Sequence, residues 1–407
     1  MNATPWIRSR AWDGFWMMSG FWIPTLFLLL PLDRAKPLVL IVTLLFWIGH
    51  RIASLYLGFC VGEYREVLQA RRRYFLGFPL GLLGLLAAFL LAPESLIPLS
   101  LTGRFVLLLF LDYFLSLYHF SAQHYGVLSM YRGRLAHGQT DPGLLRWDWW
   151  ICLAVSGLFS IAMDFLNGEL DDFSLFVHAP LISQAAFEGL RLALTFLVLL
   201  VWGLTARKYL RKGQGPARIL YISSLCYLTI VSFYLAPLLY FFVVQMQHWF
   251  VSLGLTTHMA GNSRFEPKSG AKAWWYRPWA WINAKALGPL LLLVVLSLGL
   301  TPFLEADYFI LHRFDSETLT VPGFLVRFEG SLWVYVFGGL AIFSSFLHYI
   351  YDRGIFRFSD PLTRRAALPL LKPLGATGKG QTEDLGGEVY ALRNLRPQAE
   401  LSAESRP

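Results

Sequence analysis

The sequence predicts an all-α protein, a polytopic bundle of about ten transmembrane helices. Hydrophobic residues make up 56% of the 407 positions and charged residues only 15%, which is typical of a membrane-embedded body. Apolar stretches long enough to cross a bilayer recur along the chain, and the connections between them alternate in positive charge. Basic loops at a membrane also explain the net charge of +9, so we expect no nucleic-acid partner.

Each apolar stretch has about the 20 residues that a helix needs to cross the hydrocarbon core. The run from residue 219 to 260 is too long for one crossing, and we place a break at Tyr234 to Pro237, because proline opposes helix continuation. The predicted helices cover residues 15–32, 37–59, 74–97, 105–129, 148–166, 186–206, 219–235, 237–260, 285–303 and 331–350. Together they form a transmembrane domain of residues 1–352.

The charge of the connections predicts the orientation. Lys and Arg gather at the amino terminus and in every second connection, for example at Arg71, Arg72 and Arg73, and basic loops face the cytoplasm. Both termini are therefore predicted to be cytoplasmic, in a multi-pass protein of a bacterial-type cytoplasmic (inner) membrane. Residues 353–407 are rich in Pro, Gly and charge and are expected to form a largely flexible cytoplasmic tail.

Histidines are the polar residues that stand out within the predicted helices. His137, His178 and His312 fall in predicted loops, where a solvated surface role is the simplest interpretation. The other six lie on the second, fourth, eighth and tenth helices, and they are His50, His119, His124, His248, His258 and His348. A lone membrane histidine usually hydrogen-bonds a neighbouring helix, but six on one side of the bilayer indicate a metal, because neutral imidazole is the commonest metal ligand.

The helical rise of about 1.5 Å per residue gives the depth of each histidine below the nearest cytoplasmic charge. His124, His258 and His348 form a shallow layer roughly 7 to 12 Å inward, and His119, His248 and His50 form a deeper layer roughly 20 to 24 Å inward. A shift of several ångströms by tilt or helix breaks would merge the layers into one binuclear site. His119 and His124 are separated by about 140° around an ideal helix, so they could serve two ions.

Other polar residues share a helix face with a histidine or lie beside one, and Arg51, next to His50, faces another direction. They could orient the metal ligands, handle protons or contact a substrate, and they are Asp112, Gln123, Gln245, Arg51 and Tyr125. Hydrogen bonding between helices is an equally good interpretation of the two glutamines, and ordinary packing is the simpler one for Tyr125. No catalytic residue can be assigned.

The segment His119 to His124, with the sequence HFSAQH, resembles the HxxxxH box of integral membrane non-haem iron enzymes, the group of alkane hydroxylases and fatty-acid desaturases or hydroxylases. The chain contains no HxxHH box, and its other histidines are dispersed singly. In general plan the chain is also similar to bacterial Brp/Blh-type carotene dioxygenases, polytopic proteins thought to hold iron with histidines from several helices.

Both resemblances imply an iron-dependent oxygenase or oxidase with mononuclear or binuclear non-haem iron. Its substrate would be hydrophobic or lipid-like and would reach a cytoplasm-facing site, and an electron-donor protein and membrane lipids would be its partners. A b-type haem protein for electron transfer and a proton- or metal-coupled transporter are the alternatives, because paired histidines also bind haem and buried histidines also carry protons.

Overall fold

The computed structural model describes residues 5–133, 141–159, 162, 163, 166, 182–235, 237–263, 273–285, 287–304 and 332–372. Every regular element in these residues is a helix. The α-helices are α1 (Arg10–Trp12), α2 (Ser19–Leu29), α3 (Leu32–Val42), α4 (Ile48–Arg51), α5 (Ala53–Cys60), α6 (Arg65–Ala70), α7 (Phe78–Leu91), α8 (Leu101–Gly133), α9 (Pro142–Leu153), α11 (Gln184–Arg211), α12 (Pro216–Ser232), α13 (Pro237–Gly261), α14 (Ala273–Asn283), α15 (Gly288–Leu304), α18 (Leu332–Ile355) and α19 (Pro361–Leu370).

Short helical segments of other types join several of these α-helices. Four are π-helical and one, η3 (Gly62–Tyr64), is a 3-10 helix. The π-helical segments are η1 (Asp13–Met17), η2 (Thr43–Trp47), η4 (Arg73–Gly77) and η5 (Ala154–Leu158). Such segments are frequent at functional sites, and η2 directly precedes α4, which carries His50.

The predicted all-α fold is confirmed, and helix is present in each of the ten predicted stretches. The predicted break is also present, because α12 ends at Ser232 and α13 begins at Pro237, with a turn in which the Leu235 amide donates to the Ser232 carbonyl at 3.2 Å. By length and composition, three described helices could cross a membrane, namely α8, α11 and the joined η4–α7. Two bent pairs, 37–60 and 277–301, raise the number to five if each pair is one span.

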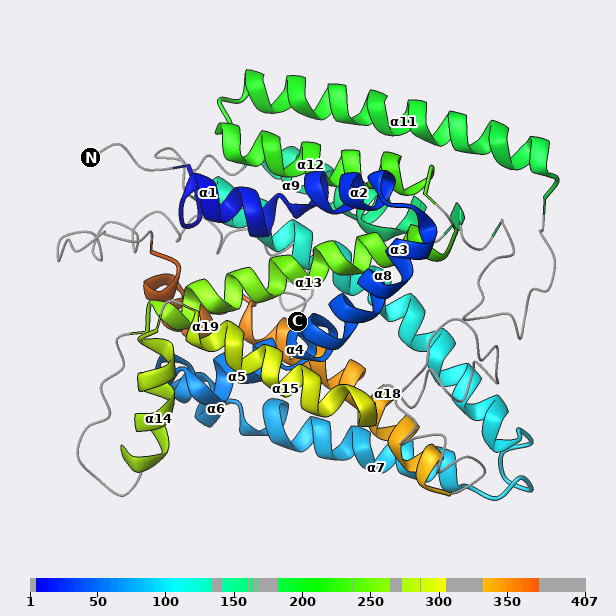
Figure 1. The fold of residues 1–407 in the computed structure, drawn as a ribbon. Helices are drawn as coiled ribbons and strands as arrows, with labels where there is room; N and C mark the ends of the chain where they lie inside the picture. Colours follow the sequence, from blue (N-terminus) through cyan, green and yellow to red (C-terminus); the bar gives the residue numbers. More distant parts are fainter. Residues whose placement is uncertain are drawn as a thin grey trace, which may run out of the picture.

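Helix α13 lies at the centre of the bundle (Figure 1). It packs against α2 and α12 on one side and against α4, α5 and α15 on the other. Helix α18 packs against α5, α7, α8 and α15, while α11 covers α12 at one edge of the bundle (Figure 1). Apolar side chains of α11 such as Leu192 and Phe196 are more than 60% exposed, which is the surface expected of a helix that faces lipid.

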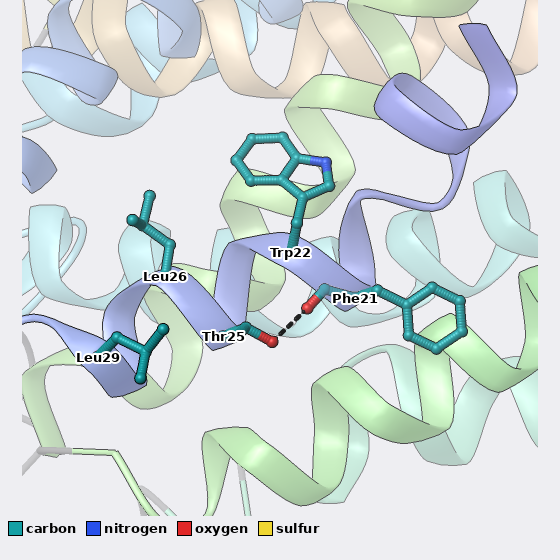
Figure 2. A pocket seen from close by; sticks show the side chains of 5 residues that line it. All are labelled: Phe21, Trp22, Thr25, Leu26 and Leu29. Atoms are coloured by element: carbon teal, nitrogen blue, oxygen red, sulfur yellow. Dashed lines mark hydrogen bonds between the residues drawn. The ribbon is translucent and has the colours of Figure 1, made fainter. Parts of the chain in front are cut away.

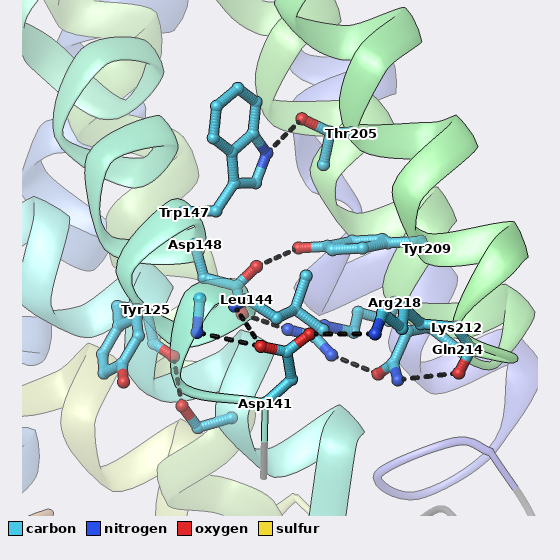
Figure 3. Close-up of polar contacts among 12 residues, drawn as sticks. Tyr125, Asp141, Leu144, Trp147, Asp148, Thr205, Tyr209, Lys212, Gln214 and Arg218 are labelled. Atoms are coloured by element: carbon cyan, nitrogen blue, oxygen red, sulfur yellow. Dashed lines mark hydrogen bonds and ion pairs between the residues drawn. The ribbon is translucent and has the colours of Figure 1, made fainter. Parts of the chain in front are cut away.

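A buried ion pair holds the ends of α9, α11 and α12 together (Figure 3). Arg218 donates to Asp148 Oδ2 and to Gln214, and Tyr209 donates to Asp148 Oδ1 at 2.5 Å. Asp148 and Arg218 are each 1% exposed. Outside this buried pair, a hydrogen bond from Lys212 holds the pKa of the half-buried Asp141 below its usual range.

The first part of the predicted flexible tail is instead a packed helix. In α19, the side chain of Asp360 caps the first turn by accepting from the Thr363 amide at 2.8 Å, and Pro361 occupies the first helical position. Asn262 at the end of α13 donates to the Leu370 and Lys372 carbonyls, both at 2.8 Å. Average composition did not predict this helix, although an Asp-Pro start followed by spaced apolar residues is a helix signal. Residues 373–407 lie outside the described residues.

Candidate metal centre

Five of the six predicted histidines meet where α4, α8, α13 and α18 converge. They are His50, His119, His124, His248 and His348, and none is more than 7% exposed. Ring centroids lie 4.6 Å apart for His119 and His348, 4.8 Å for His119 and His248, 4.8 Å for His50 and His348, and 5.3 Å for His50 and His248. His124 is at the edge of the group, 6.3 Å from His248.

The two predicted layers are joined at His348 in the structure. His348, expected in the shallow layer, contacts His50 and His119 of the deeper layer. The depth of His348 was counted from Arg353, but the end of α18 is itself covered, since Tyr64 donates to the Ile355 carbonyl at 3.2 Å and Thr363 of α19 donates to the Gly354 carbonyl at 3.5 Å. The first charge therefore does not mark the end of the buried region.

His258 is buried but lies apart from the other five. It follows His248 by ten residues on α13, which corresponds to about 15 Å along the helix. Its Nε2 is 3.5 Å from Nδ2 of Asn262, the residue that binds the end of α19. His258 is therefore a structural neighbour of α19 rather than a member of the cluster. The loop histidines, His137, His178 and His312, lie outside the described residues.

Asp352 joins the cluster, although the sequence analysis did not single it out. It is 8% exposed, and its Oδ2 lies 3.5 Å from His119 Nε2 while its Oδ1 lies 3.5 Å from His348 Nδ1. The Nε2 atoms of His119 and His348 are 3.0 Å apart. A sequence signal was present, because His348 and Asp352 are four residues apart and so share one face of α18.

The potential ligand atoms form two overlapping groups that share His348. The first, the His–His–Asp group, consists of His119, His348 and Asp352, and the second, the three-histidine group, consists of His50, His248 and His348. Within each group the ligand atoms lie within 4.8 Å of one another. Two ligand atoms at about 2.1 Å from one ion, at angles of 90° to 109°, are about 3.0 to 3.4 Å apart, so the separations of 3.0 and 3.5 Å in the first group fit a common ion.

Several polar atoms of the cluster have no hydrogen-bond partner. They include both ring nitrogens of His248, Nε2 of His124 and Oδ1 of Asp352, all of them buried. Each such group costs about 1 to 3 kcal/mol, and almost all buried polar groups in proteins are paired. A bound cation would satisfy these lone pairs together, which the present protein partners do not.

The orientation of His50 leaves one nitrogen available. Its Nδ1 contacts the Trp47 carbonyl oxygen, and because a carbonyl only accepts, we assign the proton to Nδ1. The lone pair then lies on Nε2, as in metal sites where a backbone carbonyl fixes the histidine tautomer. His50 also stacks on Trp249 at 5.7 Å, which holds the ring in place.

Two of the predicted neighbours border the cluster through other side chains. Asp112 accepts a hydrogen bond from Ser345 at 3.1 Å, and Ser345 in turn is 3.4 Å from the hydroxyl of Tyr349, whose ring lies 4.7 Å from His119. Arg51 donates to Ser344 at 3.2 Å and lies over the Trp47 ring at 4.7 Å. Both residues are therefore placed behind the ligands rather than among them.

The other three predicted neighbours differ in their distance from the histidines. Gln123 donates to the His248 carbonyl at 3.4 Å. Tyr125 packs against Trp149, and it is Tyr221 instead whose hydroxyl contacts His124 Nδ1 at 2.6 Å. Gln245 is half-buried on α13, and among the described contacts no hydrogen bond joins its side chain to a histidine.

An apolar groove opens on α2, away from the ligands (Figure 2). Its lining residues are Phe21, Trp22, Thr25, Leu26 and Leu29, and the Thr25 hydroxyl is bound by its own helix, at 2.7 Å from the Phe21 carbonyl. The Trp22 ring lies 5.1 Å from Phe250, the residue that follows Trp249. Aromatic packing thus connects the groove with the helix segment that stacks on His50.

Comparison of the chain with protein-family models, with curated proteins and with solved structures found no match. Fold and site geometry therefore carry the functional conclusions.

Proposed function

We propose that the protein is a multi-pass membrane metalloenzyme whose histidine cluster holds non-haem iron for an oxygenase or oxidase reaction. The observation that carries the proposal is the His–His–Asp group, because two histidines and one carboxylate are the donor set typical of non-haem Fe(II) oxygenases. Three protein ligands leave coordination positions open, and iron bound there would supply the activation of oxygen.

The residues of the chain have separate tasks in this proposal. His119, His348 and Asp352 hold the ion, while Asp112, Ser345 and Tyr349 fix the ring of His119 from behind. Burial of all ligands to at least 92% keeps bulk water away from the site. The chain thus contributes ligands, their orientation and a dry surrounding.

The proposed membrane location rests on the ten predicted stretches, each of which contains helix, and on the apolar exposed surfaces of α7 and α11. In this arrangement both termini face the cytoplasm, and the membrane is a bacterial-type cytoplasmic membrane. A hydrophobic substrate fits such a location, and the groove on α2 provides an apolar surface whose Trp22 packs on Phe250 of α13, the helix that also carries His248.

A bare ion fits the cluster better than haem does. Two axial histidines of a haem lie on opposite faces of a wide macrocycle. Here the rings pack edge to face against each other, with interplanar angles of 79° for His119 and His248 and 70° for His119 and His348. This close packing favours ligands that converge on a small ion.

The test is metal analysis of the detergent-purified protein after anaerobic loading with Fe(II), together with its visible spectrum. We expect at least one iron per chain without a Soret band, and an electron paramagnetic resonance signal after addition of nitric oxide, which requires an open position on Fe(II). Asp352→Asn should lower the iron content by one per chain and remove the nitric oxide signal of that iron, because a ligand of the His–His–Asp group is lost.

Asp13→Asn is the matched control. Asp13 is also a buried carboxylate, but it accepts from the Ile7 amide at 2.7 Å and from Tyr131 at 3.0 Å and lies outside the cluster. The folded fraction of this variant should keep its iron. A Soret band with haem stoichiometry, or a chain that takes up no metal, would show the proposal to be wrong.

A further inference from the structure

We infer that the protein binds a second transition-metal ion, held by the three-histidine group of His50, His248 and His348 beside the proposed iron. This inference rests on the proposed function in one respect, because the two groups share His348. The ion would be a divalent metal that prefers nitrogen ligands, such as zinc, copper or a second iron, since no carboxylate belongs to this group.

His248 provides the strongest support. It is 0% exposed and neither of its ring nitrogens has a hydrogen-bond partner. A neutral imidazole has one donor and one acceptor, so a purely structural histidine at this position would leave both unsatisfied, at a cost of about 1 to 3 kcal/mol for each. An ion on one nitrogen removes the larger part of this penalty, because the lone pair then has a partner.

One ligand atom from each of His50, His248 and His348 lies within 4.8 Å of the other two. The Trp47 carbonyl fixes the His50 tautomer with the lone pair on Nε2, and the His50 ring is nearly perpendicular to those of His248, at 80°, and His348, at 79°. His124 offers a further buried nitrogen, Nε2, without a partner. The ring of His124 lies 6.3 Å from that of His248, so a fourth histidine nitrogen is close to the three-histidine group.

His348 can serve both ions. Its two nitrogens lie on different edges of the ring, and each can bind an ion once the ring proton has been released to solvent. The resulting negative charge would lie between two divalent cations, where it is favoured electrostatically. The ring of His348 lies 4.6 Å from that of His119 and 4.8 Å from that of His50, so it borders members of both groups.

The test is a titration of the metal-free, detergent-purified protein with Co²⁺ alone, followed by visible absorption and by metal analysis after desalting. We expect two cobalt ions per chain in the natural protein and one in His248→Ala. Asp352→Asn should also bind one, because it removes the other position. His258→Ala is the matched control, since it changes a buried histidine of the same helix outside both groups, and it should bind two.

The outcomes separate this inference from the proposed function. A natural protein that binds one cobalt, with His248→Ala unchanged, overturns the second ion and leaves the iron proposal intact. If Asp352→Asn keeps its full nitric oxide signal with Fe(II), the iron proposal fails whatever the cobalt number. If His248→Ala does not fold, electron paramagnetic resonance of the natural protein tests the inference instead. The second equivalent of Co²⁺ should then weaken the signal of the first, because two ions that share His348 are magnetically coupled. Two independent signals would refute the shared site.

Discussion

Two buried polar regions of this protein differ in how completely their atoms are paired. In the network of Asp148 and Arg218, both carboxylate oxygens accept hydrogen bonds, from Tyr209 and from Arg218 (Figure 3). In the histidine cluster, both nitrogens of His248 and one oxygen of Asp352 are buried without a partner. The carboxylate of the first region is fully paired by the protein, although Nε of Arg218 has no hydrogen-bond partner, whereas the proposed cation would pair the open atoms of the second region.

The difference has an energetic meaning. A buried ion pair with good geometry roughly balances the cost of removing its charges from water, whereas a buried group without a partner is a net loss. A chain that retains several such losses at one point, on the three helices α8, α13 and α18, would be stabilised by a compensating interaction there. We therefore assign a stabilising role to the Asp148 network and a binding role to the histidine cluster.

His348→Ala should have the largest effect, because it removes the ligand that both groups share. Loss of a supporting partner alone typically weakens metal binding about 10- to 100-fold, so we expect loss of a shared ligand to weaken both positions at least about 100-fold. Equilibrium dialysis with Co²⁺ would measure this. The variant should still elute as a folded protein, and retention of either ion at natural affinity would contradict the shared role.

Arg218→Met tests the stabilising role of the Asp148 network. It leaves Asp148 buried beside Tyr209 without its cation, and such a change typically costs about 3 to 5 kcal/mol. We expect a loss of this size in the free energy of unfolding in detergent, with an unchanged number of metal ions per folded chain. Arg211→Met, at an exposed position near the end of α11, should change stability by no more than about 0.5 kcal/mol. Equal losses in the two variants would refute the stabilising role.

Much of the fold could be predicted from hydrophobicity alone. The length of apolar stretches located helix in all ten places, and proline at position 237 located the break before α13. The start of α19 was missed because the surrounding residues have the composition of a disordered tail, although Asp360 and Pro361 carry a helix-start signal. Local capping chemistry outweighed average composition at this position.

The sequence predicted that histidines form the site, but it did not predict which side chains lie together. Five histidines of four predicted helices do converge, since a buried imidazole needs a partner. The depth of His348 was counted along α18 from Arg353, but α19 and Tyr64 cover that end of the helix. Packing by other parts of the chain cannot be read from residue spacing along one helix. Asp352 was not predicted, although it lies four residues after His348 on the same face of α18.

The smallest expected effect concerns Asp360, which caps the first turn of α19, the helix that covers the end of α18. Although partial burial opposes its ionisation, the Thr363 amide and hydroxyl and then the charges of Arg71 and Arg357 hold the pKa of Asp360 below its usual range. A carboxylate with a depressed folded-state pKa stabilises the folded state above its unfolded pKa of about 3.9, and this contribution is lost as the pH falls through the folded value. Removal of the cap by Asp360→Ala should cost about 0.5 to 2 kcal/mol in the docking of α19.

Limited proteolysis of the carboxyl-terminal region would report this docking. We expect the natural protein to be protected at neutral pH and to be cleaved faster as the pH falls from about 4 toward the depressed folded pKa, where Asp360 becomes protonated. Asp360→Ala should be cleaved faster at every pH, while Asp360→Asn, which can still cap the helix but cannot titrate, should be protected at neutral pH and lose most of the pH dependence. If Asp360→Asn shows the full acid response of the natural protein, another carboxylate controls the docking of α19. Asp352 would then be the first to examine, since α19 covers the end of the helix that carries it.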